Sequence, residues 1–192
     1  MKIRTIINIL VLAPLFSFAQ QSEAYFELMN NLIPIDSSKI ETSFSNEKPK
    51  YIGTTTDYEY MGKEYVFLTG KHIRYYKGGS RTEGAYNSWG TVLTNKHFDK
   101  NGNLISDSKT ITLDTSAKNL KEFEDSSKHI TFVIKTNDYK YSSDLNKHYL
   151  YLKSEHTNGE KSGTWEYYFP NGELKKRENI KKRIITLYEN NT

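Results

Sequence analysis

The fold is decided by the stretch Gly163-Thr-Trp-Glu-Tyr-Tyr-Phe-Pro-Asn-Gly172-Glu-Leu174, in which two glycines nine positions apart enclose a run rich in aromatic residues. An Asn-Gly pair allows the positive φ angles of a tight hairpin turn, because glycine has no Cβ to clash. Aromatic residues before such a turn are typical of a β-strand. The stretch therefore predicts a strand over 164–169, a hairpin turn at Gly172 and a second strand over 173–180.

The same pattern recurs along the chain. A glycine at a predicted turn has an aromatic residue four positions earlier in three places, which are Tyr75 with Gly79, Phe98 with Gly102, and Tyr168 with Gly172. Gly70 lies nine positions before Gly79, as Gly163 does before Gly172. Because one hairpin cannot bury its own aromatic residue, we expect these units to stack against one another.

At these residues the chain resembles the bacterial MORN-type repeat, written Gly-x-Trp-x-x-Tyr-x-x-x-Gly-x-Leu and found in proteins labelled YwqK-family antitoxins. The matching positions are Gly163, Trp165, Tyr168, Gly172 and Leu174, then Gly70, Tyr75 and Gly79, and in the second half only Phe98, Gly102 and Leu104. The resemblance covers about 70–107 and 163–180. It implies a sheet of stacked hairpins that serves as a partner-binding surface, and it implies no catalytic residues.

The rest of the chain completes a mainly β prediction. Ser22 can cap a short N-terminal helix that ends before Pro34, and a polar linker is expected over 35–50. Hairpins are expected from Tyr51 onwards. They are interrupted by a helix over 117–124, which Ser116 caps, and by strands over 130–135 and 147–156. The predicted organisation is a signal peptide at 1–19, a helix and linker at 20–50, and a β-repeat domain at 51–192 with an insertion at about 111–160.

The N-terminus predicts export. Lys2 and Arg4 precede an apolar run over 6–18 that is shorter than the roughly 20 residues a bilayer span requires. Ser17-Phe18-Ala19 then offers a signal-peptidase site. We therefore expect a periplasmic or secreted protein with no membrane span. The chain has 0 cysteines, which excludes a cysteine-linked lipid anchor and a disulfide framework.

Motifs for catalysis and for cofactors were not found. The 5 histidines show no metal-ligand spacing, and neither a nucleophile elbow nor a phosphate-binding loop is present, so neither a cofactor nor a metal is expected. The near-neutral charge left after removal of the leader does not predict nucleic-acid binding. A glycosidase that uses Glu155, Glu160 or Glu166, with His156 beside them, is the weakest alternative.

Exposed tyrosines supply the candidate binding surface, because amphipathic rings give a large contact area at little entropic cost. The candidates are Tyr76, Tyr149, Tyr151 and Tyr167. The sequence thus predicts an exported, non-catalytic protein that binds a protein partner, with an immunity protein against a periplasm-acting toxin as a specific version. The alternative is a module that binds peptidoglycan or another glycan.

Overall fold

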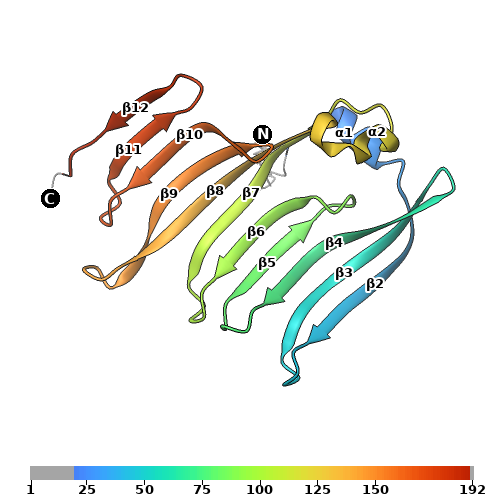
Figure 1. Cartoon of the computed structure of the whole chain (residues 1–192), viewed down its shortest axis with the longest axis horizontal. Helices are drawn as coiled ribbons and strands as arrows, with labels where there is room; N and C mark the ends of the chain where they lie inside the picture. The colour runs from blue at the N-terminus through green and yellow to red at the C-terminus, as the bar shows by residue number, and fades with distance from the viewer. Residues whose placement is uncertain (1–19, 191–192) are drawn as a thin grey trace, which may run out of the picture.

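The computed structural model describes residues 20–190, and the predicted signal peptide at 1–19 lies outside them. Strands dominate the chain (Figure 1). In chain order the elements are β1 (Gln20–Gln21), α1 (Glu23–Met29), β2 (Ile33–Ser43), β3 (Pro49–Tyr60), β4 (Lys63–Tyr75), β5 (Arg81–Tyr86), β6 (Val92–Phe98), β7 (Leu104–Thr115), α2 (Leu120–Glu124), α3 (Ser126–His129), β8 (Ile130–Ser142), β9 (Lys147–Thr157), β10 (Glu160–Tyr168), β11 (Leu174–Asn179) and β12 (Ile184–Leu187).

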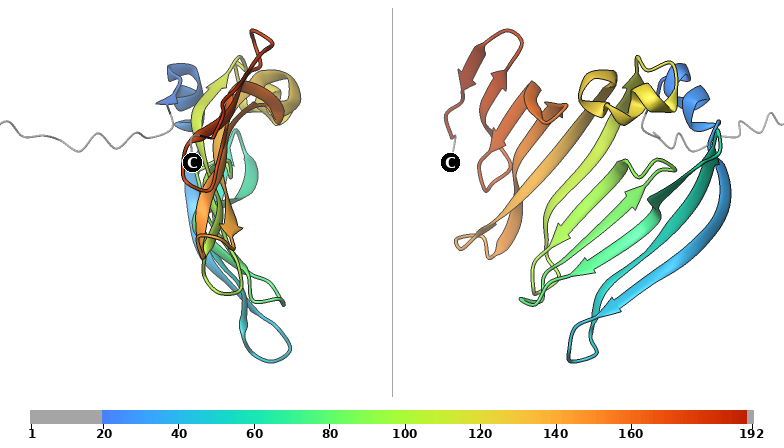
Figure 2. Two further views of the ribbon diagram at one scale, coloured as in Figure 1. Left: turned by 90° about the vertical axis from the view of Figure 1, so that its left-hand side faces the viewer. Right: turned by 45° about the vertical axis from the view of Figure 1, so that its right-hand side comes forward.

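Strands β2 to β12 form one antiparallel meander in which each strand pairs with its neighbours in sequence, and β1 adds a short parallel pairing to β7. Seen edge-on, the sheet is a single curved layer with a helical segment at one end (Figure 2). The prediction of a mainly β, antiparallel sheet of hairpins with a short N-terminal helix and an internal helix is therefore confirmed.

Five hairpin turns share one backbone geometry, at 44–48, 76–80, 87–91, 99–103 and 169–173. In each, the first N–H donates to the fifth carbonyl and the fourth N–H donates to the first carbonyl. The fourth residue has a positive φ, which explains why glycine stands there in four of the five turns, at Gly79, Gly90, Gly102 and Gly172. The Gly90 turn was not predicted, although Tyr86 lies four positions before it.

The earlier glycine of the repeat also has a structural role. Gly70 and Gly163 have φ angles of 70° and 59°, and each lies beside a register shift in its strand pairing. A Cβ on Gly163 would lie 2.3 Å from Glu155 Oε1. These glycines therefore shape bulges that bend the strands, in the way that bulges do in other sheets.

The buried core lies where the short hairpin β5–β6 leaves a gap between the longer strands β4 and β7. Helices α1 and α2 fill this gap, beyond the tip of the hairpin (Figure 1). Tyr25, Leu113, Leu120 and Phe123 are 0% exposed, and Trp89 from the hairpin tip packs edge-on against Phe123. Elsewhere the sheet has no second layer among the described residues, so most of its two faces remains accessible.

Three predictions about the organisation were wrong. The expected linker at 35–50 is mostly strand β2, which pairs with β3 from Ile33 to Ser43 despite its polar sequence. The expected insertion at 111–160 does not interrupt the sheet, because β8 and β9 continue the meander and only the helical segment leaves it. That helix begins later than predicted, since Asn119 rather than Ser116 accepts the capping hydrogen bond, from the N–H of Glu122.

Candidate functional site

A single register row crosses all eleven strands of the meander. Residues paired across neighbouring strands lie on the same face of a sheet, so this row defines one face, called here the ring face. The row runs Thr42, Tyr51, Arg74, Thr82, His97, Ser106, Asp138, Leu152, Tyr167, Lys176 and Leu187. At a strand spacing of about 4.8 Å, it extends for about 48 Å. Such a length offers room for a large partner.

Tyr151 and Tyr167 meet on the ring face, because a register shift between β8 and β9 interrupts the alternation of side chains at Tyr151. Their rings are in edge-to-face contact with centroids 6.1 Å apart. Lys140 Nζ lies 3.4 Å from the Tyr151 centroid and Lys176 Nζ lies 5.0 Å from the Tyr167 centroid. Both rings are half-buried, so their orientation is fixed by the neighbouring side chains while part of each ring faces solvent. Tyr149, opposite Lys140 in register, extends the group along β9.

Tyr76, the fourth predicted candidate, lies apart from the other three. It follows β4, where its ring stacks on His97 and its hydroxyl accepts a hydrogen bond from Thr82. Strand β4 is five positions from β9 in the sheet, which corresponds to about 24 Å. The structure therefore brings Tyr149, Tyr151 and Tyr167 together and places Tyr76 at a separate location on the same face.

The last strand adds apolar side chains that the sequence interpretation missed. Leu187 pairs with Lys176, next to Tyr167, and Ile185 pairs with Glu178. Their side chains are 74% and 62% exposed, although they belong to a strand. Leu187, Ile185, Tyr149, Tyr151 and Tyr167, flanked by Lys140 and Lys176, are called here the C-terminal patch. The uncharged run Ile184-Ile185-Thr186-Leu187 at the end of the sheet was the signal that could have revealed it.

Glu178 lies buried beneath this patch. The ammonium groups of Lys161 and Lys176 contact its two carboxylate oxygens. Hydrogen bonds from Lys161 and then Lys176 hold the pKa of Glu178 below its usual value. The Lys176 ammonium is therefore held between the Glu178 carboxylate and the Tyr167 ring. These two contacts order the side chain although it is not fully buried.

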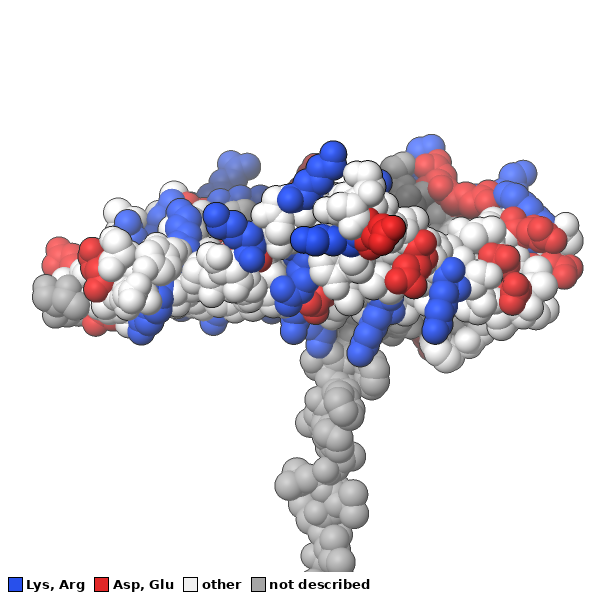
Figure 3. Space-filling view, turned by 90° about the horizontal axis from the view of Figure 1, so that it is seen from below, with Lys and Arg blue, Asp and Glu red and all other residues white. Residues whose placement is uncertain are grey.

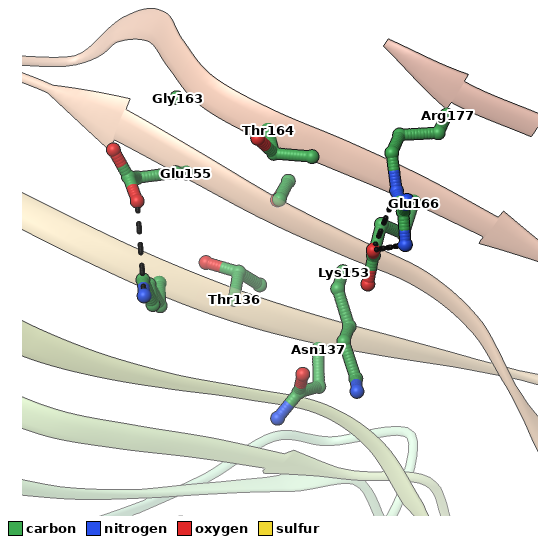
Figure 4. Close-up of a pocket in the computed structure, with 10 residues that line it drawn as sticks. Thr136, Asn137, Lys153, Glu155, Gly163, Thr164, Glu166 and Arg177 are labelled. Atoms are coloured by element: carbon green, nitrogen blue, oxygen red, sulfur yellow. Dashed lines mark hydrogen bonds and ion pairs between the residues drawn. The ribbon is translucent and has the colours of Figure 1, made fainter. Parts of the chain in front are cut away.

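The opposite face carries a polar depression of about 500 Å³ between β8 and β11. Figure 4 shows Lys153, Glu155, Glu166 and Arg177 around it. Arg177 donates from Nε and Nη2 to Glu166 Oε1, at 2.9 and 2.7 Å, and Tyr168 donates to Glu166 Oε2 at 2.7 Å. The Tyr168 hydroxyl, followed by Arg177, lowers the pKa of Glu166. Glu166 is therefore held as a carboxylate.

This arrangement does not favour the glycosidase alternative. Glu155 and Glu166 line the same depression, whereas His156 lies on the ring face against Trp165, with ring centroids 5.1 Å apart. A general acid needs a raised pKa, while that of Glu166 is lowered. Across residues 20–190 no group of three or more His, Cys, Asp or Glu side chains is placed to hold a metal ion.

Comparison with known protein families and with curated proteins finds no match for this chain. None of the helices in the described part of the chain is long and apolar enough to cross a bilayer. The functional assignment therefore rests on the two surfaces of the sheet and on the residues that line them.

Proposed function

We propose that this chain is an exported, non-catalytic binding protein of the MORN-repeat type whose C-terminal patch holds a protein partner. The observation that carries the proposal is the ordered pair Tyr151 and Tyr167 beside the exposed Ile185 and Leu187 of an edge strand. Aromatic rings and aliphatic side chains on one surface, surrounded by charged groups, are what protein interfaces use as anchors.

The sheet edge adds to this surface. Strand β12 pairs only with β11 among the described residues, so its other side presents backbone N–H and C=O groups that a partner strand can bind. Exposed edges are commonly protected by charge, and β12 contains no charged residue over Ile184–Leu187. A partner that covers the C-terminal patch would also cover this edge.

The specific version is an immunity protein that neutralises a toxin acting in the periplasm. The MORN-type resemblance at Gly163, Trp165, Tyr168 and Gly172 supports it, since that repeat occurs in proteins labelled antitoxins. Protection of cells by this chain, when a toxin encoded beside its gene is directed to the periplasm, would support this version. Lack of any protection would leave a general partner-binding role.

The test is a pull-down of the chain from Gln21 with envelope and secreted fractions of its own organism, read by mass spectrometry. We expect one stoichiometric protein with the wild type and its loss with Tyr151→Ala combined with Tyr167→Ala. Tyr141→Ala is the matched control, because Tyr141 is 56% exposed and pairs with His148 outside the C-terminal patch. A partner retained by the folded double variant would contradict the proposal.

A glycan-binding role is the second candidate function. It is favoured by a separate observation, a ring-lined hollow without acidic residues at the other end of the sheet.

A further inference from the structure

A hollow lies between the turns that join β2 to β3 and β4 to β5. It consists of two adjoining depressions of about 580 and 500 Å³ that share Phe44, Tyr75, Tyr76 and Lys77. A smaller depression of about 240 Å³ continues along the ring face and shares Tyr51, Arg74 and Tyr76 with its neighbour. This connected surface, called here the N-terminal hollow, is lined by Phe44, Tyr51, Arg74, Tyr75, Tyr76 and Lys77.

The charged side chains that line the N-terminal hollow are all positive. Lys48, Lys50, Arg74 and Lys77 line it, and no Asp or Glu does. Within residues 20–190 none of these four cations forms an ion pair. Figure 3, which views this end of the strands, shows Lys and Arg side chains projecting from the middle of the molecule, with Asp and Glu side chains beside them. An anionic ligand would therefore meet cations that no described acidic side chain pairs with.

One ring of the hollow, that of Tyr51, is held in place by the buried side chain of His72. His72 is 3% exposed, and its Nε2 lies 2.9 Å from the Thr69 carbonyl, which can only accept a hydrogen bond. Nε2 therefore carries the proton, and Nδ1 is left to accept the hydrogen bond from the Tyr51 hydroxyl at 2.5 Å. Arg74 lies over the Tyr51 ring at 5.4 Å. Ligand binding would thus require little ordering of Tyr51 and Arg74.

We infer that the N-terminal hollow is a binding site for a saccharide that carries carboxylate groups. Tyrosine rings offer flat surfaces to the C–H faces of sugar rings, the unpaired cations suit carboxylates, and Ser45, Asn46 and Ser80 suit hydroxyl groups. This inference stands independently of the protein-partner proposal, because it concerns a different surface and different residues.

An acidic peptide fits the hollow less well. The C-terminal patch offers Ile185 and Leu187 as exposed aliphatic anchors, whereas the aliphatic side chains that line the hollow are only Pro49 and Val92. Strand β4, which supplies Arg74 and Tyr75, is hydrogen bonded to strands on both sides, so it offers a peptide no main-chain edge. Edge strand β2 contributes only Thr42 to the lining, so most of the recognition would come from side-chain rings and charges.

The experiment is calorimetric titration of the chain from Gln21 with a hexamer of galacturonate, a neutral maltohexaose and a hexaglutamate peptide. We expect binding of the galacturonate hexamer, at least tenfold weaker binding of the other two, and at least a tenfold loss with Arg74→Gln combined with Lys77→Gln. The matched control is Lys181→Gln combined with Lys182→Gln, which removes the same charge from the β11–β12 turn. Tyr151→Ala combined with Tyr167→Ala should retain saccharide binding.

Three results would overturn the inference. The first is the absence of galacturonate binding. The second is an equal loss of affinity in the two lysine-containing variants, which would indicate non-specific charge attraction. The third is hexaglutamate binding as tight as that of the saccharide, which would assign the hollow to acidic polypeptides. Tyr76→Ala provides a second variant, since its ring is 41% exposed and its loss should weaken saccharide binding without unfolding the sheet.

Discussion

His72 and Trp165 occupy equivalent positions in two distant repeats, and each donates a ring N–H to the carbonyl three residues earlier. The distances are 2.9 Å from His72 Nε2 to Thr69 O and 3.1 Å from Trp165 Nε1 to Ser162 O. In both cases the carbonyl belongs to the residue just before a glycine with positive φ. The ring therefore closes the bulge that the glycine opens, which explains how His72 can stand where the repeat pattern has Trp.

The first prediction concerns this hydrogen bond. Trp165→Phe should destabilise the protein by about 1–2 kcal/mol beyond its loss of buried area, because the carbonyls of Ser162 and Glu155 both lose a donor. Trp165→His restores a ring N–H as in the other repeat and should be more stable than Trp165→Phe, although its ring is smaller. Urea unfolding of the two variants measures the difference, and a more stable Trp165→Phe would refute the role of the hydrogen bond.

A second prediction concerns close packing at Gly53. A Cβ there would lie 2.2 Å from His72 Nδ1, and that ring is buried and held at both nitrogens. Gly53→Ala should therefore destabilise the fold by about 1–3 kcal/mol. Gly84→Ala is the control, since the nearest atom to its Cβ would be the Thr94 carbonyl oxygen at 3.4 Å. Equal thermal midpoints for the two variants would show that His72 can move aside.

The sequence predicted those features of the fold that single residues determine, and it missed those that depend on distant parts of the chain. The turns at Gly79, Gly102 and Gly172 could be predicted, because a positive φ is a property of the single residue that adopts it and glycine adopts it most readily. Strand β2 was missed because both its faces are exposed, so the apolar alternation that marks a strand is absent. The position of the core was also missed, since it depends on β5 and β6 being shorter than their neighbours.

The sequence predicted several residues of the candidate site but not the distances between them. Tyr149, Tyr151 and Tyr167 were candidates from the sequence, and the pairing of β9 with β10 brings them together. Sequence spacing gave no measure of the distance to Tyr76, because five strand spacings separate it from this group. Leu187 could not be identified as part of the surface from the sequence, because its exposure depends on β12 being the edge strand of the sheet.

A third prediction uses the pH dependence of Glu166. Its pKa is lowered in the folded state by the Tyr168 hydroxyl and by Arg177, so the unfolded chain binds this proton more tightly. The resulting stability is present above the ordinary glutamate pKa of 4.5 and is lost as the pH falls through the lower folded pKa. Glu166→Gln should flatten the decline in unfolding free energy below that pH. An unchanged acid profile of the variant would contradict this linkage.

The fourth prediction concerns the alkaline side. Burial, followed by the hydrogen bond to Glu166, raises the pKa of Tyr168 from 10.0 to about 12. Between these values the folded protein keeps a proton that the unfolded chain releases, so stability should fall as the pH rises through this interval. Tyr168→Phe should remove that part of the slope. Tyr167→Phe is the control, and an equal effect of both variants would show that Tyr168 is not responsible.

The fifth prediction tests whether the helical segment is an integral part of the fold. Phe123 from α2 contacts both Tyr25 from α1 and Trp89 from the β5–β6 turn, with ring centroids 5.7 and 4.8 Å apart. Because Phe123 is 0% exposed, Phe123→Ala should cost about 3–5 kcal/mol. Leu145→Ala, at a side chain that is 42% exposed in the β8–β9 turn, should change stability little. Chemical denaturation followed by tryptophan fluorescence reports on this cluster through Trp89. If Phe123→Ala unfolded at the same denaturant concentration as Leu145→Ala, the sheet would hold without its core, and stability would have to come from strand pairing alone.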